Sequence, residues 1–490
     1  MQDVQACFER PMLSRLFGVI LARLLSPLAS FVIIVLIARM WGRDDLGQFN
    51  TVLAWLAIFQ FVSLFGMGEY ISKEIGKAPS TGERYLTHGL LFGLMSSLIF
   101  ALLMIGGAVL FRYPEQVRHG IMIAALGLAF STWTLICQSV FTAYQKIKLV
   151  ALASLFENFL FLLLGSAIII KEYGLLSLIW CLVIARVLAS ALSLYMAHKY
   201  VARVNFQIDR AFFWKLLTPV AIFGLTGVAH QIFMRIDVIM LSKMKDMATV
   251  GLYASASKLM EICLMLPLAF YILNLPVAAR GYKGFRESVQ QSVEAYTGDL
   301  FVLSFFVFGF ITFFARPILG HIFGEPFVAA TWVLRILILA FLVHSAEMVL
   351  GMSCQAAGYH KFAMHVSSFR ALANIVLNFV LIPVWAAVGA ALATLLSVSL
   401  SFAIFQVFVK RTLHGIQWIS IVKKPALACL FIMCLLFPLT SRLNSLLLGF
   451  VFLFGYGFFL FALNGFSVRA RYILRTKPAG EMELIQNRSK

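Results

Sequence analysis

The sequence has few charged residues: Asp, Glu, Lys and Arg make up 12% of its 490 residues, whereas 61% are hydrophobic. A soluble domain is about half apolar and about a quarter charged, so this composition excludes a soluble globular protein. The apolar residues come in continuous runs of about 20, separated by short charged stretches, which is typical of membrane-spanning helices and unlike the alternating strands of a membrane barrel. We therefore expect an all-α polytopic membrane protein with about 14 transmembrane helices.

Cysteine and acidic residues are also scarce. The 7 cysteines are scattered without a C-x-x-C pair, which excludes a disulfide framework and a cysteine metal site. Lys and Arg number 40 against 21 Asp and Glu, for a formal net charge of +19. Most of these cations fall in alternate segments between the spans, which predicts cytoplasmic N- and C-termini. This bias explains the charge, and the chain lacks the basic domain that a nucleic-acid partner requires.

Two pairs of short segments indicate an internal repeat. Residues 38–49 match 242–253, which aligns Met40 with Met244 and Gly47 with Gly251, and residues 143–146 match 358–361. Each pair lies at equivalent ends of predicted spans that run in the same direction. We therefore expect two six-helix lobes related by a parallel repeat, at 1–200 and 201–410, followed by two further spans and a basic cytoplasmic tail in 411–490.

Several strings resemble the bacterial polysaccharide-transporter family. Residues 235–261 match its R-x-D-x-x-M-L and V-G-x-Y-x-x-A-x-K-L-x-E strings, and residues 374–394 match its N-x-x-L-N-x-x-L-I-P and G-A-A-x-A-T strings. One departure is the Trp385-Ala386-Ala387 stretch, which stands where a glycine is usual. The motif residues are Arg235, Asp237, Gly251, Tyr253, Asn374, Asn378 and Pro383.

That family is part of the multidrug, oligosaccharidyl-lipid and polysaccharide exporter superfamily. The resemblance implies a flippase that carries an undecaprenyl-diphosphate-linked oligosaccharide from the cytoplasmic to the periplasmic leaflet by alternating access, for O-antigen, exopolysaccharide or capsule biosynthesis. It further implies a location in the bacterial cytoplasmic (inner) membrane, no enzymatic activity and no cofactor. The implied partners are the lipid bilayer, the lipid-linked substrate, and the polysaccharide polymerase and glycosyltransferases of the same pathway.

Five basic residues fall inside predicted spans, where a charge costs about 2.5–3.5 kcal/mol on insertion scales. Spread along a cavity wall, they would offer successive contacts to an anionic diphosphate. The alternative is that each extends its charge to the membrane surface or pairs internally; Lys258 and Glu261, three residues apart on one helix face, suit such a pair. The five residues are Arg23, Arg186, Lys258, Arg335 and Arg370.

Three acidic residues, Glu157, Glu261 and Glu347, also lie in predicted spans. They are candidates either for binding a coupling ion, H⁺ or Na⁺, or for pairing with the intramembrane cations. His344 and Glu347 are too few ligands for a metal site.

Two other functions deserve comparison. A multidrug-type cation-coupled exporter of the same superfamily would favour an acidic cavity, whereas the basic residues in the spans outnumber the acidic ones. A glycosyltransferase, polymerase or ligase could use Asp44 and Asp45, but the sequence leaves no room for a large external domain. We interpret this pair as capping the following helix.

Overall fold

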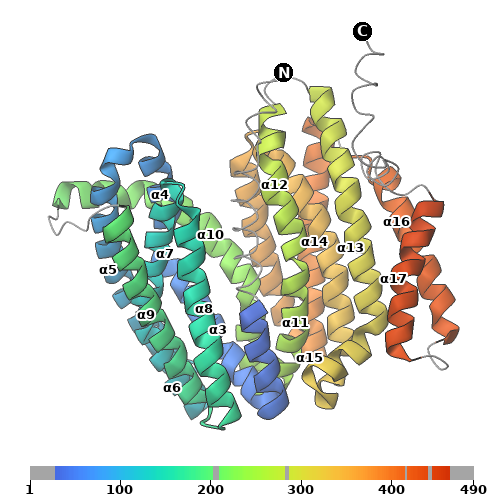
Figure 1. The fold of residues 1–490 in the computed structure, drawn as a ribbon, viewed down its shortest axis with the longest axis horizontal. Helices are drawn as coiled ribbons and strands as arrows, with labels where there is room; N and C mark the ends of the chain where they lie inside the picture. Colours follow the sequence, from blue (N-terminus) through green and yellow to red (C-terminus); the bar gives the residue numbers. More distant parts are fainter. Residues whose placement is uncertain (1–27, 202–208, 282–285, 414–415, 440–443, 464–490) are drawn as a thin grey trace. The chain divides into compact units, whose positions relative to one another are not determined.

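The computed structural model describes residues 28–201, 209–281, 286–413, 416–439 and 444–463 (Figure 1). Within these residues all regular structure is helical, which confirms the predicted all-α class. A helix over Leu28–Met40 comes first. It is followed by α3 (Arg43–Leu64), α4 (Met67–Lys77), α5 (Gly82–Leu110), α6 (Glu115–Leu126), α7 (Leu128–Ala143), α8 (Ile147–Ile170), α9 (Leu175–Tyr200), α10 (Arg210–Met244), α11 (Met247–Cys263), α12 (Met265–Gly281), α13 (Arg286–Phe323), α14 (Thr331–Ala356), α15 (His360–Thr412), α16 (Trp418–Leu436) and α17 (Ser445–Ala462).

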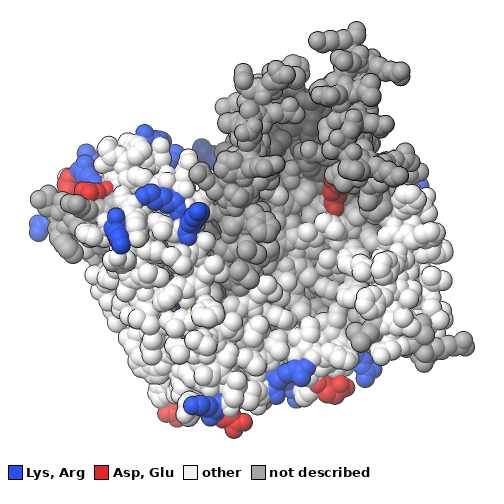
Figure 2. Space-filling view, viewed as in Figure 1, with Lys and Arg blue, Asp and Glu red and all other residues white. Residues whose placement is uncertain are grey.

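Many of these helices have the length and surface of membrane spans. The described residues contain nine helical segments long and apolar enough to cross a membrane, or up to ten if α6 and α7, bent by 43° at Gly127, form one span. Large apolar side chains such as Leu102 of α5, Phe159 of α8 and Ile184 of α9 are exposed. Figure 2 shows Lys and Arg near the helix ends and a nearly uncharged surface between them. An uncharged band of exposed apolar side chains suits lipid, so the chain is a multi-pass membrane protein.

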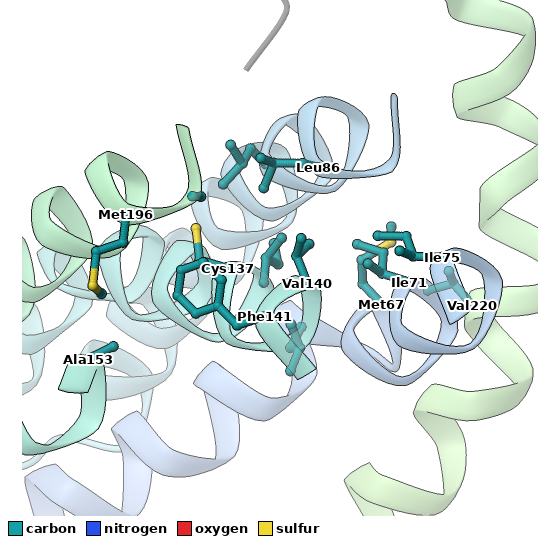
Figure 3. Packing of buried hydrophobic residues seen from close by; sticks show 14 residues of the cluster. Met67, Ile71, Ile75, Leu86, Cys137, Val140, Phe141, Ala153, Met196 and Val220 are labelled. Atoms are coloured by element: carbon teal, nitrogen blue, oxygen red, sulfur yellow. The ribbon is translucent and has the colours of Figure 1, made fainter. Parts of the chain in front are cut away.

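The chain divides into two units. Unit 1 takes in the described parts of 1–262 together with 316–337 and 364–401, and unit 2 takes in those of 263–315, 338–363 and 402–490. In unit 1, side chains from α4, α5, α7, α8, α9 and α10 form a buried apolar cluster, including Met67, Leu86, Phe141 and Met196 (Figure 3). In unit 2, rings from α13 pack around Phe452 of α17.

Helices α3 and α11 of unit 1 meet at two glycines that the predicted repeat aligns. A Cβ added to Gly47 would lie 1.9 Å from the carbonyl oxygen of Met247, and one added to Gly251 would lie 2.1 Å from that of Arg43. The contact is therefore reciprocal, as expected where two related segments meet across a two-fold axis. Only glycine allows the backbones this close, because any side chain would push the helices apart.

The start of α3 differs in detail from the sequence-based interpretation. Gly42 occupies the N-cap position, and no side chain caps the helix. Asp44 and Asp45 lie in the first turn instead. Their negative charges there favour the positive end of the helix dipole, so they support the same helix start by a different interaction.

Helix α15 is broken at Ala386. This residue has φ 48° and ψ −126°, so His360–Thr412 consists of two helical segments that meet there. A non-glycine residue in such a conformation costs about 1–3 kcal/mol, whereas glycine adopts it freely. The break therefore explains why the resembling family usually has a glycine in this stretch. It also separates Asn374 and Asn378 from Thr394, so that two differently directed segments of α15 reach one place in unit 1.

Candidate functional site

Unit 1 contains a cavity of about 210 Å³ among its helices. Its wall combines apolar side chains such as Phe161 of α8 with polar ones such as Asn50 and Gln60 of α3. Three cations line it, each from a different helix of Figure 1: Arg186 from α9, Arg235 from α10 and Lys258 from α11. We refer to this cavity as the cationic pocket.

Two of these cations share one carboxylate. Arg235 Nη1 donates to Glu261 Oε1 at 2.8 Å, and Lys258 Nζ donates to Glu261 Oε2 at 3.1 Å. The Arg235 and Glu261 side chains are 32% and 30% exposed, so this ion pair lies at the cavity wall. A ligand that enters the pocket therefore meets the same N–H groups that Glu261 now occupies.

The third cation is held more loosely. Arg186 Nε lies 3.5 Å from Glu157 Oε1, and Arg186 Nη1 donates to Ser131 Oγ at 2.9 Å. Only 12% of the Arg186 side chain is exposed. The ion pair with Glu157 is a charge contact without a hydrogen bond, because 3.5 Å is long for an N–H···O bond.

Both guanidinium groups keep an unused donor. Among the described residues, Arg186 Nε and Arg235 Nε are buried and have no hydrogen-bond partner. The great majority of buried donors in proteins have a hydrogen-bond partner, so each exception requires an explanation, such as an ordered water or a ligand that supplies the acceptor. An anion with several oxygens matches this need, because guanidinium groups bind phosphate through paired hydrogen bonds.

The other predicted cations lie elsewhere. The Arg335 guanidinium sits 5.0 Å from the Trp332 ring centre, near the start of α14. Arg370 is 4% exposed and stacks over Phe233 at 4.1 Å, outside the pocket lining. Arg23 lies outside the described residues. Of the five predicted cations, Arg186 and Lys258 line the pocket, and Arg235 lines it as well. Arg235 was not among the predicted intramembrane cations, because the apolar run ends just before it, whereas α10 continues to Met244.

The three predicted acidic residues all have cationic or titratable neighbours. Glu157 contacts Arg186, Glu261 bridges two cations, and Glu347 lies 2.8 Å from His344 Nδ1 in unit 2. Pairing with a cation thus accounts for Glu157 and Glu261.

The motif residues converge at a second place in unit 1, centred on Asp237 of α10. This carboxylate is 5% exposed and accepts hydrogen bonds from Tyr253 Oη at 2.6 Å, Asn378 Nδ2 at 2.6 Å and Thr394 Oγ1 at 2.8 Å. Asn374 Oδ1 in turn accepts from Asn378 Nδ2 at 3.0 Å. We call these five residues the Asp237 cluster. All the donors are neutral. Asn378 Oδ1 and Asn374 Nδ2 are both buried without a hydrogen-bond partner among the described residues.

Sequence reasoning recorded most of these residues as a family signature but gave them no role. Thr394 ends the G-A-A-x-A-T string, which was the one signal for it. Of the remaining motif residues, Gly251 makes the close helix contact, and the Pro383 carbonyl accepts from Lys245 Nζ at 3.0 Å. The described residues contain no group of three or more His, Cys, Asp or Glu side chains placed to hold a metal ion.

Comparisons with known proteins agree with this fold. The chain is 23% identical to a probable low-salt glycan biosynthesis flippase, Agl15, of Haloferax volcanii over 374 residues, which cover 75% of this chain and 77% of that protein. It is 21% identical to the capsular polysaccharide biosynthesis protein CapF of Staphylococcus aureus over 398 residues, covering 80% and 97%.

Solved structures of the same fold include two transporter types. The lipid II flippase MurJ, in an inward closed conformation, matches with a TM-score of 0.75 at 16% identity, covering 93% of this chain and 99% of MurJ. An inward-facing MATE multidrug transporter matches with a TM-score of 0.69 at 14% identity, covering 79% and 94%. The polysaccharide biosynthesis protein family model matches residues 14–280, more than half of the chain, which confirms the resemblance seen in the motifs. The chain therefore belongs to the polysaccharide biosynthesis protein family.

Proposed function

We propose that the protein is a flippase that moves an undecaprenyl-diphosphate-linked oligosaccharide from the cytoplasmic to the periplasmic leaflet, for O-antigen, exopolysaccharide or capsule biosynthesis. The observation that carries this proposal is the cationic pocket, with two buried guanidinium Nε donors that lack a hydrogen-bond acceptor among the described residues. A diphosphate carries at least two negative charges and several acceptor oxygens, and it would otherwise cross the hydrocarbon layer without partners. The names of the relatives as flippases support the same activity.

The charge balance of the pocket argues against the multidrug alternative. Arg186, Arg235 and Lys258 face two carboxylates, Glu157 and Glu261, so one positive charge is left over. A cationic drug would be repelled, whereas an anionic headgroup would be attracted. Arg23, Arg335 and Arg370 remain predicted further contacts along the headgroup path. The proposed transport involves no covalent chemistry and no resident cofactor.

The Asp237 cluster is the best candidate for a coupling cation, H⁺ or Na⁺. Its carboxylate is buried among neutral donors, and Asn378 Oδ1 lacks a hydrogen-bond partner among the described residues. A buried negative charge is costly unless a proton or cation compensates it. Carboxylate, amide and hydroxyl oxygens are the donors that hard cations prefer. Glu157 and Glu261 are weaker candidates, because cations already neutralise them.

The proposed topology extends the observed helices. We expect about 14 spans with both termini cytoplasmic, arranged as lobes 1–200 and 201–410 plus an appendage in 411–490. The reciprocal contact of Gly47 and Gly251 supports the parallel repeat. Two such lobes would alternate access to a central path in the bacterial inner membrane, next to the glycosyltransferases and polymerase of the pathway.

Transport by the purified protein in liposomes tests the function directly. We expect it to move a fluorescent polyprenyl-diphosphate oligosaccharide between leaflets and to leave a cationic dye unmoved. Export of the dye without movement of the lipid would overturn the flippase proposal in favour of the multidrug exporter. Transport assays with an imposed Na⁺ gradient and, separately, an imposed proton gradient would identify the coupling ion.

A further inference from the structure

Glu261 stands where a phosphate group of the proposed substrate would bind. Its two carboxylate oxygens each engage one cation, Arg235 at 2.8 Å and Lys258 at 3.1 Å. Two oxygens of a phosphate could bridge the same two cations in the same way. We propose that Glu261 is an internal counter-anion that competes with the substrate diphosphate for Arg235 and Lys258, and thereby sets how tightly the headgroup binds and how fast it leaves. This inference rests on the proposed flippase function.

The position of Glu261 makes the competition direct. Glu261, Arg235 and Lys258 all line the cationic pocket, so the carboxylate shares the cavity with any ligand there. Glu261 follows Lys258 by three residues on α11, so the carboxylate stays close to its cation when the ligand leaves. The 30% exposure of its side chain gives it room to move off the cations when an anion arrives.

A transporter needs such a competitor, because a headgroup that binds too tightly is released too slowly. Cations without counter-ions in a partly buried site attract a diphosphate strongly, since the local dielectric constant is low. That attraction would keep the headgroup bound in the cationic pocket. A tethered carboxylate that reclaims the cations weakens binding and helps release, and it also keeps the empty pocket close to charge balance.

Glu157 offers a comparison, because it pairs with a cation of the pocket but does not line the cavity. It faces only Arg186, at 3.5 Å and without a hydrogen bond, and Glu157 is not part of the cavity lining. Arg186 is instead held by Ser131 at 2.9 Å. Glu157 therefore competes with a ligand much less than Glu261 does.

The test measures binding of a short-chain prenyl diphosphate to the purified full-length protein, by titration calorimetry, together with lipid flipping in liposomes. In Glu261→Gln, which keeps the shape and removes the charge, we expect diphosphate binding about tenfold tighter than in the wild type and slower flipping at saturating lipid. KM and kcat should therefore fall together. Glu157→Gln should change binding by about twofold or less.

The outcomes separate this inference from the proposed function. If the wild type does not bind the diphosphate probe, both the proposed function and the proposed role of Glu261 are wrong. If the wild type binds and Glu261→Gln binds equally or more weakly, the role of Glu261 alone is wrong. Inorganic diphosphate in a parallel titration shows whether the phosphates suffice or the prenyl chain is needed.

A second variant guards against loss of structure. Glu261→Asp keeps the charge but draws the carboxylate back by one methylene, so it should tighten binding by a smaller factor than Glu261→Gln. If Glu261→Gln lowers the melting temperature, the diphosphate should restore it by a larger shift than in the wild type. A destabilised variant whose melting temperature does not respond to diphosphate would contradict the proposal.

Discussion

The cationic pocket and the Asp237 cluster share helices α10 and α11 of unit 1 but have opposite charge. Arg235 and Asp237 are two residues apart on α10, so they face different sides of that helix. On α11, Glu261 belongs to the pocket and Tyr253, eight residues earlier, belongs to the cluster. Among the described residues, the pocket holds paired cations with two guanidinium Nε donors that lack a partner, whereas the cluster holds a carboxylate with neutral donors and an amide oxygen and an amide nitrogen, Asn378 Oδ1 and Asn374 Nδ2, that lack one. The proposed function uses this difference in charge: an anionic headgroup would bind in the pocket and a coupling cation at the buried carboxylate.

The largest expected effect comes from removing the cations of the pocket. Replacing both Arg186 and Arg235 by Ala should lower polymer export about 100-fold, because each charged hydrogen bond contributes about 1.5–3 kcal/mol. The measurement is export in cells that lack the native gene, normalised to protein in the membrane. Lys77→Ala is the control, since the Lys77 side chain is 59% exposed, pairs with Glu74 and lies outside the pocket lining. Normal export by the double variant would remove the pocket from the mechanism.

The next effect separates the second site from the first. Asp237→Asn should lower transport about tenfold and abolish its dependence on the coupling cation, while diphosphate binding stays near the wild-type value. Transport with and without an imposed ion gradient measures the first part, and titration the second. Thr394→Val removes one of the three hydrogen bonds that the Asp237 carboxylate accepts and keeps the carboxylate itself, so it should have a smaller effect. An Asp237→Asn variant that keeps its full cation dependence would show that coupling occurs elsewhere.

A third change disturbs both sites without altering the chemistry of either. Gly251→Val would push α11 away from the backbone of Arg43, and α11 carries residues of the pocket and of the cluster. We expect diphosphate binding and cation dependence to fall together, by severalfold, with about 1–3 kcal/mol lost in stability. Gly76→Ala is the control, because a Cβ there meets no atom within 4 Å. Loss of one property alone would show that the two sites do not depend on this shared packing.

The smallest change concerns the break in α15 that completes the cluster. Ala386→Gly should relieve the strained backbone conformation and raise stability by up to about 1–3 kcal/mol. Thermal unfolding in detergent measures it, and diphosphate binding should not change. A lower melting temperature would mean that glycine's greater freedom in the unfolded chain outweighs the relief.

Part of the pocket could be predicted from the sequence. A cation within an apolar run carries a free-energy cost in the membrane whatever the orientation of its helix, so its position alone indicates a functional or paired residue. That argument identified Arg186 and Lys258, and helical spacing suggested that Lys258 contacts Glu261. It missed Arg235, because the apolar window ends before the helix does. It offered an intramembrane cation as a partner for Glu157 but could not identify Arg186, since α8 and α9 bring together residues that are far apart along the chain.

The contacts of the Asp237 cluster could not be predicted from the sequence. Asp237 and Thr394 are 157 positions apart, so no local pattern links them. The all-α class was predictable because apolar runs specify helices directly. The break at Ala386 was not, because a left-handed alanine is imposed by its surroundings and disfavoured by its own conformational preference.

The most direct test of the central claim compares a short-chain prenyl diphosphate with the matching monophosphate in binding to the wild type and to the Arg186→Ala/Arg235→Ala variant. The account predicts that the wild type binds the diphosphate at least about tenfold more tightly than the monophosphate, and that the double variant loses this preference. Equal affinity of both proteins for both lipids would contradict it.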